Sequence, residues 1–245
     1  MKIRLLLSMA SLGLIGVVAL AGATVCLTSG CSTLGYYAQA VGGHLAVVAA
    51  ARPVPEVLAD PRTGMALRER LLLSQRIRDY AVSELKEPDN ASYRRYADLQ
   101  RGSVLWNVVA APELSLKLNT WCFPVVGCVG YRGYYDEAEA RAFGEGLRAQ
   151  GLEVSVYGVP AYSTLGKLPF DRFKDPLLNT FLNYPEGDLA RLIFHELAHQ
   201  IAFASGDTQF NESFATAVER LGGERWLAAN ASAEARAALA QGDAR

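Results

Sequence analysis

The residues best suited to chemistry form the run His195-Glu196-Leu197-Ala198-His199, which stands between the apolar stretches 192–194 and 201–203. Two histidines four residues apart share one face of a helix, so both imidazoles can bind a single Zn²⁺. The glutamate between them, Glu196, is directed toward the water that such a metal activates and is the predicted general base. This pattern predicts a zinc-dependent peptidase.

A third metal ligand is predicted in the run Asn211-Glu212-Ser213-Phe214-Ala215. We expect one helix from Asp188 through Phe203 and a second helix that starts at Asn211, with a short reversal between them. That reversal would bring Glu212, in the first turn of the second helix, against the two histidines. Two histidines and one glutamate leave a fourth position open, as a catalytic zinc requires. The alternative is that Asn211 and Glu212 only cap the second helix.

Other side chains near these runs have candidate roles, but their spacing leaves alternatives open. The oxyanion of a tetrahedral intermediate needs a hydrogen-bond donor, and Tyr157 and Tyr162 are the candidates. Glu219 is either an acceptor for the second ring nitrogen of a ligand histidine or a solvated charge on its helix. His44 lies far upstream and is expected to be a surface or packing residue.

One class of zinc peptidases does not match the residues that follow the second histidine. Metzincins continue the motif as HExxHxxGxxH, whereas this chain has Ala202 at the glycine position and Ser205 at the third histidine position. The gluzincin arrangement, in which a following helix supplies a glutamate ligand, fits better.

The N-terminal segment reads as a targeting signal. A basic start is followed by an apolar stretch over residues 5–27, and Leu27-Thr28-Ser29-Gly30-Cys31 resembles a lipobox. We expect residues 1–30 to be a lipoprotein signal peptide and Cys31 to carry the lipid. Because Thr28 departs from the usual apolar residue, an uncleaved transmembrane anchor is the alternative. Both predict a protein tethered outside the cytoplasm, as a periplasm-facing lipoprotein of a bacterial envelope in the first case.

The cysteines are consistent with an oxidising compartment. If Cys31 is lipidated and Cys26 leaves with the signal peptide, Cys122 and Cys128 remain, in a turn-rich segment. We therefore expect a short-loop disulfide between them. A metal site is the alternative, but no second cysteine pair lies nearby to complete four ligands.

Composition sets the scale of the fold. With 245 residues of which 51% are hydrophobic, the chain can bury a substantial core. Its 24 basic and 25 acidic residues give no reason to expect nucleic acid as a partner. We expect an N-terminal helix and Pro-rich linker over residues 31–62, a metallopeptidase domain over 63–230, and an Ala-rich tail over 231–245.

Hydrophobic periodicity predicts an α+β fold, mostly helical with a small β-sheet, and the HExxH motif adds the expectation that the domain is zincin-like. Helices are expected at 63–85, at 89–100 after a cap in 89–92, and at 137–150 between Asp136 and Gly151. Strands are expected at 103–111, 125–131 and 152–159.

Four runs of residues together resemble the bacterial family described as putative aminopeptidases, which are predicted zinc lipoproteins. These runs are residues 30–40, 162–166, 195–199 and 211–215. The resemblance extends from about residue 31 to about residue 227. It implies a gluzincin-like metallopeptidase with His195, His199 and Glu212 as ligands and Glu196 as the base.

These observations predict an envelope-anchored peptidase with one zinc per chain and a peptide substrate, aminopeptidase action being implied by the resemblance. An extended substrate could add to the edge of the sheet that contains residues 154–159. Aminopeptidase action needs an anion for the substrate's α-ammonium, and spacing assigns none, so endopeptidase action stays open. The alternative is a non-catalytic or truncated envelope lipoprotein that acts as a binding or assembly module.

Overall fold

The computed structural model describes residues 31–123, 127–166 and 170–230. The predicted signal peptide and the predicted Ala-rich tail lie outside the described residues. The chain divides into two compact units, one up to His44 and one from Leu45 onward. Within the described residues, the first unit consists of the larger part of α2 (Cys31–Ala50), in which the rings of Tyr36 and Tyr37 are 5.6 Å apart.

A membrane-crossing helix is not found in the described part of the chain, where no helix has both the length and the apolar character required. The predicted anchor over residues 5–27 falls outside that part and is not tested by this finding.

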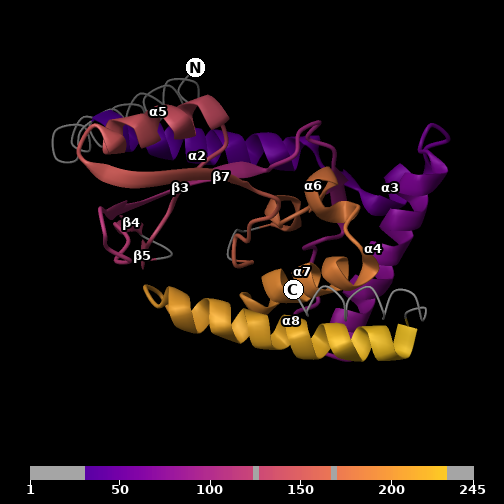
Figure 1. Cartoon of the computed structure of the whole chain (residues 1–245). Coiled ribbons are helices and arrows are strands. Elements are labelled where there is room, and N and C mark those ends of the chain that lie inside the picture. The colour runs from indigo at the N-terminus through magenta and orange to yellow at the C-terminus, as the bar shows by residue number, and fades with distance from the viewer. Residues whose placement is uncertain (1–30, 124–126, 167–169, 231–245) are drawn as a thin grey trace, which may run out of the picture. The chain divides into compact units, whose positions relative to one another are not determined.

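The second unit contains an antiparallel three-stranded sheet in which β3 (Leu105–Pro112) lies between β6 (Arg132–Tyr134) and β7 (Leu152–Val159). The β3–β7 pair runs in register from Leu105 opposite Val159 to Pro112 opposite Leu152. Helix α5 (Glu137–Arg148) packs against this sheet, as Figure 1 shows. The predicted strand 103–111 and strand 152–159 are confirmed in place and type.

Helix α5 begins and ends where the sequence predicts. The Asp136 side chain accepts a hydrogen bond from the Glu139 backbone N–H at 2.9 Å, which satisfies one free donor of the first turn. Gly151 follows the helix with a φ of +84°, a conformation that glycine adopts without strain. The buried positions Ala140, Gly144 and Leu147 recur at helical spacing and face the sheet.

A second small sheet joins β1 (Arg52–Pro53), β2 (Arg95–Ala97) and β8 (Leu177–Leu178). Strand β2 is antiparallel to β1 and parallel to β8. The helix expected over 89–100 is therefore wrong. The Tyr93 backbone N–H donates to the Asp175 carbonyl at 2.7 Å and Tyr93 has a φ of +62°, so pairing with a distant segment replaces the local helix.

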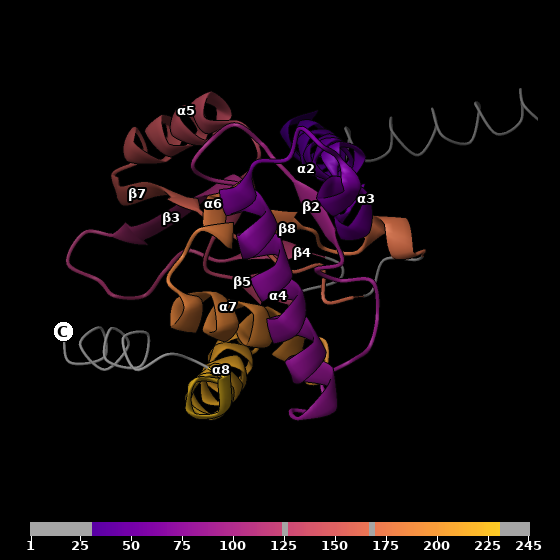
Figure 2. The same ribbon diagram turned by 90° about the vertical axis from the view of Figure 1, so that its right-hand side faces the viewer.

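The main core is formed by helices packed around the second sheet. They are α3 (Val54–Ala59), α4 (Met65–Ser83), α6 (Asn179–Leu182), α7 (Glu186–Ala198) and α8 (Thr208–Asn230). Figures 1 and 2 show α7 alongside α8, and α4 also contacts α7. One face of α7 is fully buried through Leu189, Ile193, Phe194 and Leu197. Each such side chain stabilises the fold by about 1.5–3 kcal/mol, which anchors α7 rigidly.

A short hairpin of β4 (Trp121–Phe123) and β5 (Gly127–Val129) completes the unit. Cys122 lies directly opposite Cys128, and the two form a disulfide with an S–S distance of 1.95 Å. The predicted disulfide is confirmed. The mixture of helices with small sheets also confirms the α+β prediction.

The helices that carry the histidines and Glu212 have different ends from those expected. Helix α7 begins at Glu186, with Pro185 rather than Asp188 at the N-cap, and it ends with His199 at the C-cap instead of continuing through Phe203. The second helix begins at Thr208 rather than Asn211. The Asp207 carboxylate accepts from the Phe210 backbone N–H at 2.9 Å, so Asp207 has the capping role that was expected of Asn211.

Candidate metal centre

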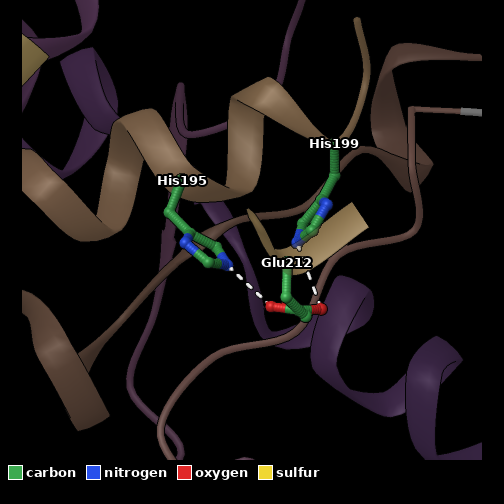
Figure 3. Close-up of side chains that lie close together, drawn as sticks. All are labelled: His195, His199 and Glu212. Carbon is green, nitrogen blue, oxygen red and sulfur yellow. Dashed lines mark ion pairs between the residues drawn. The ribbon is translucent and has the colours of Figure 1, made fainter. Parts of the chain in front are cut away.

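Three potential ligands converge between α7 and α8. His195, His199 and Glu212 each offer one ligand atom, and these atoms all lie within 4.8 Å of one another. Figure 3 shows the Glu212 carboxylate facing both imidazoles. Its Oε2 is 3.3 Å from Nε2 of His195, and its Oε1 is 3.8 Å from Nε2 of His199. The predicted spacing of two histidines and a later glutamate therefore brings the three side chains together.

The helix geometry accounts for the arrangement of the histidines. The His199 backbone N–H donates to the His195 carbonyl, so the two residues are one helical turn apart although α7 ends there. Their rings are 4.9 Å apart at an angle of 86°, which directs both Nε2 atoms toward Glu212. The turn conformation at the C-cap thus preserves the predicted common face.

Close packing of α8 against its neighbours depends on Gly222 and Gly223. A Cβ at Gly222 would lie 2.7 Å from Cδ1 of Leu85 and 3.0 Å from Cδ2 of Phe194. A Cβ at Gly223 would lie 2.7 Å from Cγ of Arg191. A side chain at either position would force these neighbours to shift, so the two glycines favour the close packing of α8 against α7.

The second ring nitrogen of His195 has a partner of its own. Nδ1 of His195 lies 2.7 Å from Oε2 of Glu219, which is about two helical turns along α8 from Glu212. A carboxylate at this position accepts the Nδ1 proton and fixes the ring so that Nε2 faces the shared centre. Of the two alternatives for Glu219, the contact with a ligand histidine is the one found.

The carboxylates shape the electrostatics of this centre. Burial by itself would lower the pKa of His195, but hydrogen bonds to Glu212 and Glu219 outweigh it and raise the pKa to about 10. The hydrogen bond to His195 lowers the pKa of Glu212. Burial raises the pKa of Glu196 to about 7. Negative charge thus gathers around two imidazoles, an environment that favours a cation.

The donor set and its dimensions fit a metal ion. Two imidazole nitrogens and a carboxylate are ligands that zinc accepts, and ligand atoms about 2.0–2.2 Å from a tetrahedral zinc lie about 3.3–3.6 Å from one another. The distances of 3.3 Å and 3.8 Å from Glu212 to the histidines are close to that separation. These three side chains could therefore hold a metal with little rearrangement.

A cavity of about 590 Å³ adjoins the centre. His195 and Glu196 line one part of it, and its wall continues along α7 through Leu192, Arg191 and Asp188. These residues share one face of the helix, since they recur at intervals of three and four. That periodicity was present in the sequence, although the cavity itself was not predicted. Of the three converging ligands, His195 alone lines this cavity, which is large enough for several residues of a peptide.

The two candidate tyrosines occupy different environments. Tyr157 lies on β7 opposite Asn107 and is 44% exposed. Tyr162 packs edge to face against Tyr135, and burial raises its pKa well above the usual range. Neither is among the three side chains that converge, so a role for either in catalysis stays a prediction.

This chain matches the model of a protein family. The family model described as "Putative aminopeptidase" matches residues 35–245. The chain belongs to that family. Neither a curated protein nor a solved structure shows significant similarity to it. Membership indicates a peptidase, and the converging ligands lie within the matched residues.

Proposed function

We propose that this family member is a zinc-dependent peptidase of the gluzincin type. The observation that supports this most directly is the convergence of His195, His199 and Glu212, with Glu196 lying between the two histidines on α7. Two histidines and a carboxylate leave a coordination position open, which is the arrangement of catalytic rather than structural zinc.

The three ligands divide their tasks. His195 and His199 would hold the metal through Nε2, from which the metal displaces any proton, and Glu212 would supply a negative charge that offsets the cation. Glu219 fixes the ring of His195 by accepting its Nδ1 proton. When bound, zinc supplies a Lewis acid that polarises a peptide carbonyl and makes a water acidic.

Glu196 provides the proton transfer. It follows His195 directly and lines the same cavity, which supports a role next to the substrate. We assign to Glu196 the acceptance of a proton from the attacking water and its delivery to the leaving amine. The substrate's chain would extend along the α7 wall of the cavity, past Leu192 toward Asp188.

The family description extends the proposal to aminopeptidase action on peptides. We further propose that the chain is lipidated at Cys31 and faces the periplasm at the bacterial envelope, on the basis of the sequence around Cys31. Metabolic labelling with a palmitate analogue, compared between the wild type and Cys31→Ala, tests this anchoring separately from catalysis.

The Glu196→Gln substitution tests the proposed chemistry. It keeps the side chain's size but removes the base, so we expect the rate of peptide hydrolysis to fall by about 10²–10⁴-fold while zinc content is retained. Glu224→Gln, on the exposed part of α8, is the matched control and should hydrolyse peptides like the wild type. Rates on a panel of peptide amides and zinc content by elemental mass spectrometry give both readouts. Equal rates in Glu196→Gln and the wild type would refute the proposed mechanism.

A further inference from the structure

The residue that precedes the glutamate ligand has an unusual set of bonds. Asn211 is only 3% exposed, although it lies in the first turn of α8. Its Oδ1 accepts from the Ala204 backbone N–H at 2.7 Å, and its Nδ2 donates to the Ala204 carbonyl at 2.9 Å. One side-chain amide therefore satisfies both backbone groups of a single loop residue, as a neighbouring β-strand would.

These two bonds lie on the path between the histidines and Glu212. Ala204 belongs to the loop that leaves His199 and returns to α8, and Asn211 is directly followed by Glu212. The amide thus ties the start of α8 to the chain that follows the second histidine. Because both bonds are needed to fix Ala204 in position and orientation, a side chain without an amide cannot replace them.

The same loop is held from its other side by the disulfide hairpin. Gly127 of β5 has a φ of +78°, and a Cβ at this position would lie 2.6 Å from the Gly206 backbone nitrogen and 2.8 Å from Oγ of Ser205. The backbone of the hairpin therefore lies directly against the loop, next to the Cys122–Cys128 disulfide. Contacts on both sides leave the loop little freedom to shift α8.

We propose that Asn211 is a positioning residue that places Glu212 against His195 and His199 through its paired bonds to Ala204. The inference rests on the metal site proposed above. It assigns to Asn211 a function other than the helix cap, which Asp207 supplies. In this account the third ligand is delivered by the loop, and the affinity for the metal depends on a side chain that does not touch the metal.

The chain contains a matched control for a merely structural role. Asn179, on α6, accepts from the Leu99 backbone N–H at 2.8 Å and donates to the Arg101 carbonyl at 3.0 Å. Its amide thus bridges backbone groups in the same manner, but it lies outside the three converging ligands. Asn179→Ala should lower stability as Asn211→Ala does, without affecting the metal.

The experiment compares zinc affinity, by competition with a chromophoric chelator, in the wild type, Asn211→Ala and Asn179→Ala. Loss of a group that orients a ligand weakens metal binding by about 10–100-fold, and we expect that loss in Asn211→Ala alone. The visible spectrum of the Co²⁺-substituted protein should change in Asn211→Ala, because Glu212 is no longer held in place, and should be unchanged in Asn179→Ala. Asn211→Asp, which keeps the Oδ1 acceptor but lacks the Nδ2 donor, should give an intermediate change in the Co²⁺ spectrum, and it replaces Asn211→Ala if the alanine variant does not fold.

The outcomes separate the inference from the function on which it rests. Wild-type affinity and spectrum in a folded Asn211 variant would overturn the positioning role while leaving the metal site intact. Equal weakening in Asn179→Ala would also overturn it, because general destabilisation would then explain the effect. A wild-type protein that binds neither Zn²⁺ nor Co²⁺ would overturn the proposed metal site, and the positioning role with it.

Discussion

The carboxylates of α5 and those of the α7–α8 pair are arranged in opposite ways. On α5, Glu137 pairs with Arg141 and Glu145 pairs with Arg148, each at 2.6 Å and on the solvent side of the helix. On α8, the polar partners of Glu212 and Glu219 are the histidines of the HExxH motif. Among the described residues, no lysine or arginine forms an ion pair with either of these two glutamates.

The charges on α5 are typical of a solvated helix surface, whereas those of Glu212 and Glu219 are typical of a metal site. Ion pairs one turn apart on a surface helix stabilise it slightly and need nothing else. Carboxylates gathered around two imidazoles repel one another and lose hydration, so the arrangement is stabilised by a positive charge, either a protonated His195 or a bound metal ion. The helix pair therefore carries the functional charge pattern, and α5 shows what ordinary helix charges look like in the same protein.

Glu219→Gln should have the largest effect among the substitutions that test this contrast between α5 and α8. It removes a carboxylate that contacts His195 but is not a ligand. We expect zinc affinity to fall by about 10–100-fold, because a neutral amide orients the imidazole and supports its basicity less well. Chelator competition at constant pH measures this change. An affinity equal to that of the wild type would mean that the contact between His195 and Glu219 is incidental.

A buried carboxylate that is not among the three converging ligands provides a second test. Asp175 is 2% exposed, and burial raises its pKa from 3.8 to about 6. Because the folded protein binds this proton more tightly than the unfolded chain, the associated stability is complete below pH 3.8 and is lost as the pH rises to about 6. Above that pH the ionised group costs about 1–3 kcal/mol.

The Asp175→Asn variant cannot titrate at this position, so the penalty should disappear. We compare the free energy of unfolding of the variant with that of the wild type at each pH. This difference should be about 1–3 kcal/mol more in favour of the variant near pH 7 than near pH 4. Urea denaturation of the metal-free proteins at the two pH values measures the change, and the histidines contribute equally to both proteins. The same difference at both pH values would contradict the raised pKa.

The smallest effect is expected on α5. Replacing Glu137 by Gln removes its pair with Arg141, which is exposed, so stability should fall by about 0.3–0.5 kcal/mol. Zinc affinity and peptide hydrolysis should be unchanged. Thermal denaturation and the chelator assay provide the two readouts, and a loss of metal affinity would break the distinction between the two sets of carboxylates.

Local signals predicted the parts of the fold that are determined locally. Asp136 and Gly151 mark the ends of α5, and alternation over residues 152–159 marks β7. The two histidines needed only helical spacing, and Glu212 needed only a short reversal after them. In each case the residues that decide the structure are neighbours in the sequence.

The predictions that were wrong or that the sequence left open depend on contacts between distant segments. Strand β2 replaces the helix expected over 89–100 because it pairs with β1 and β8, which contribute two residues each. The contact of Glu219 with His195 depends on the exact rotation of α8 against α7, and spacing alone could not choose between a ligand partner and a solvated charge. The role of Asn211 was obscured because the same residue type is also a common cap.

The central claim is that His195, His199 and Glu212 hold one catalytic zinc. Crystals of the protein prepared with one equivalent of zinc, measured at the zinc absorption edge, test it most directly through an anomalous difference map. We predict a single strong peak bonded to Nε2 of His195, Nε2 of His199 and a carboxylate oxygen of Glu212, at about 2.0–2.2 Å from each. A map without a peak between α7 and α8, or a peak held by other residues, would contradict the account.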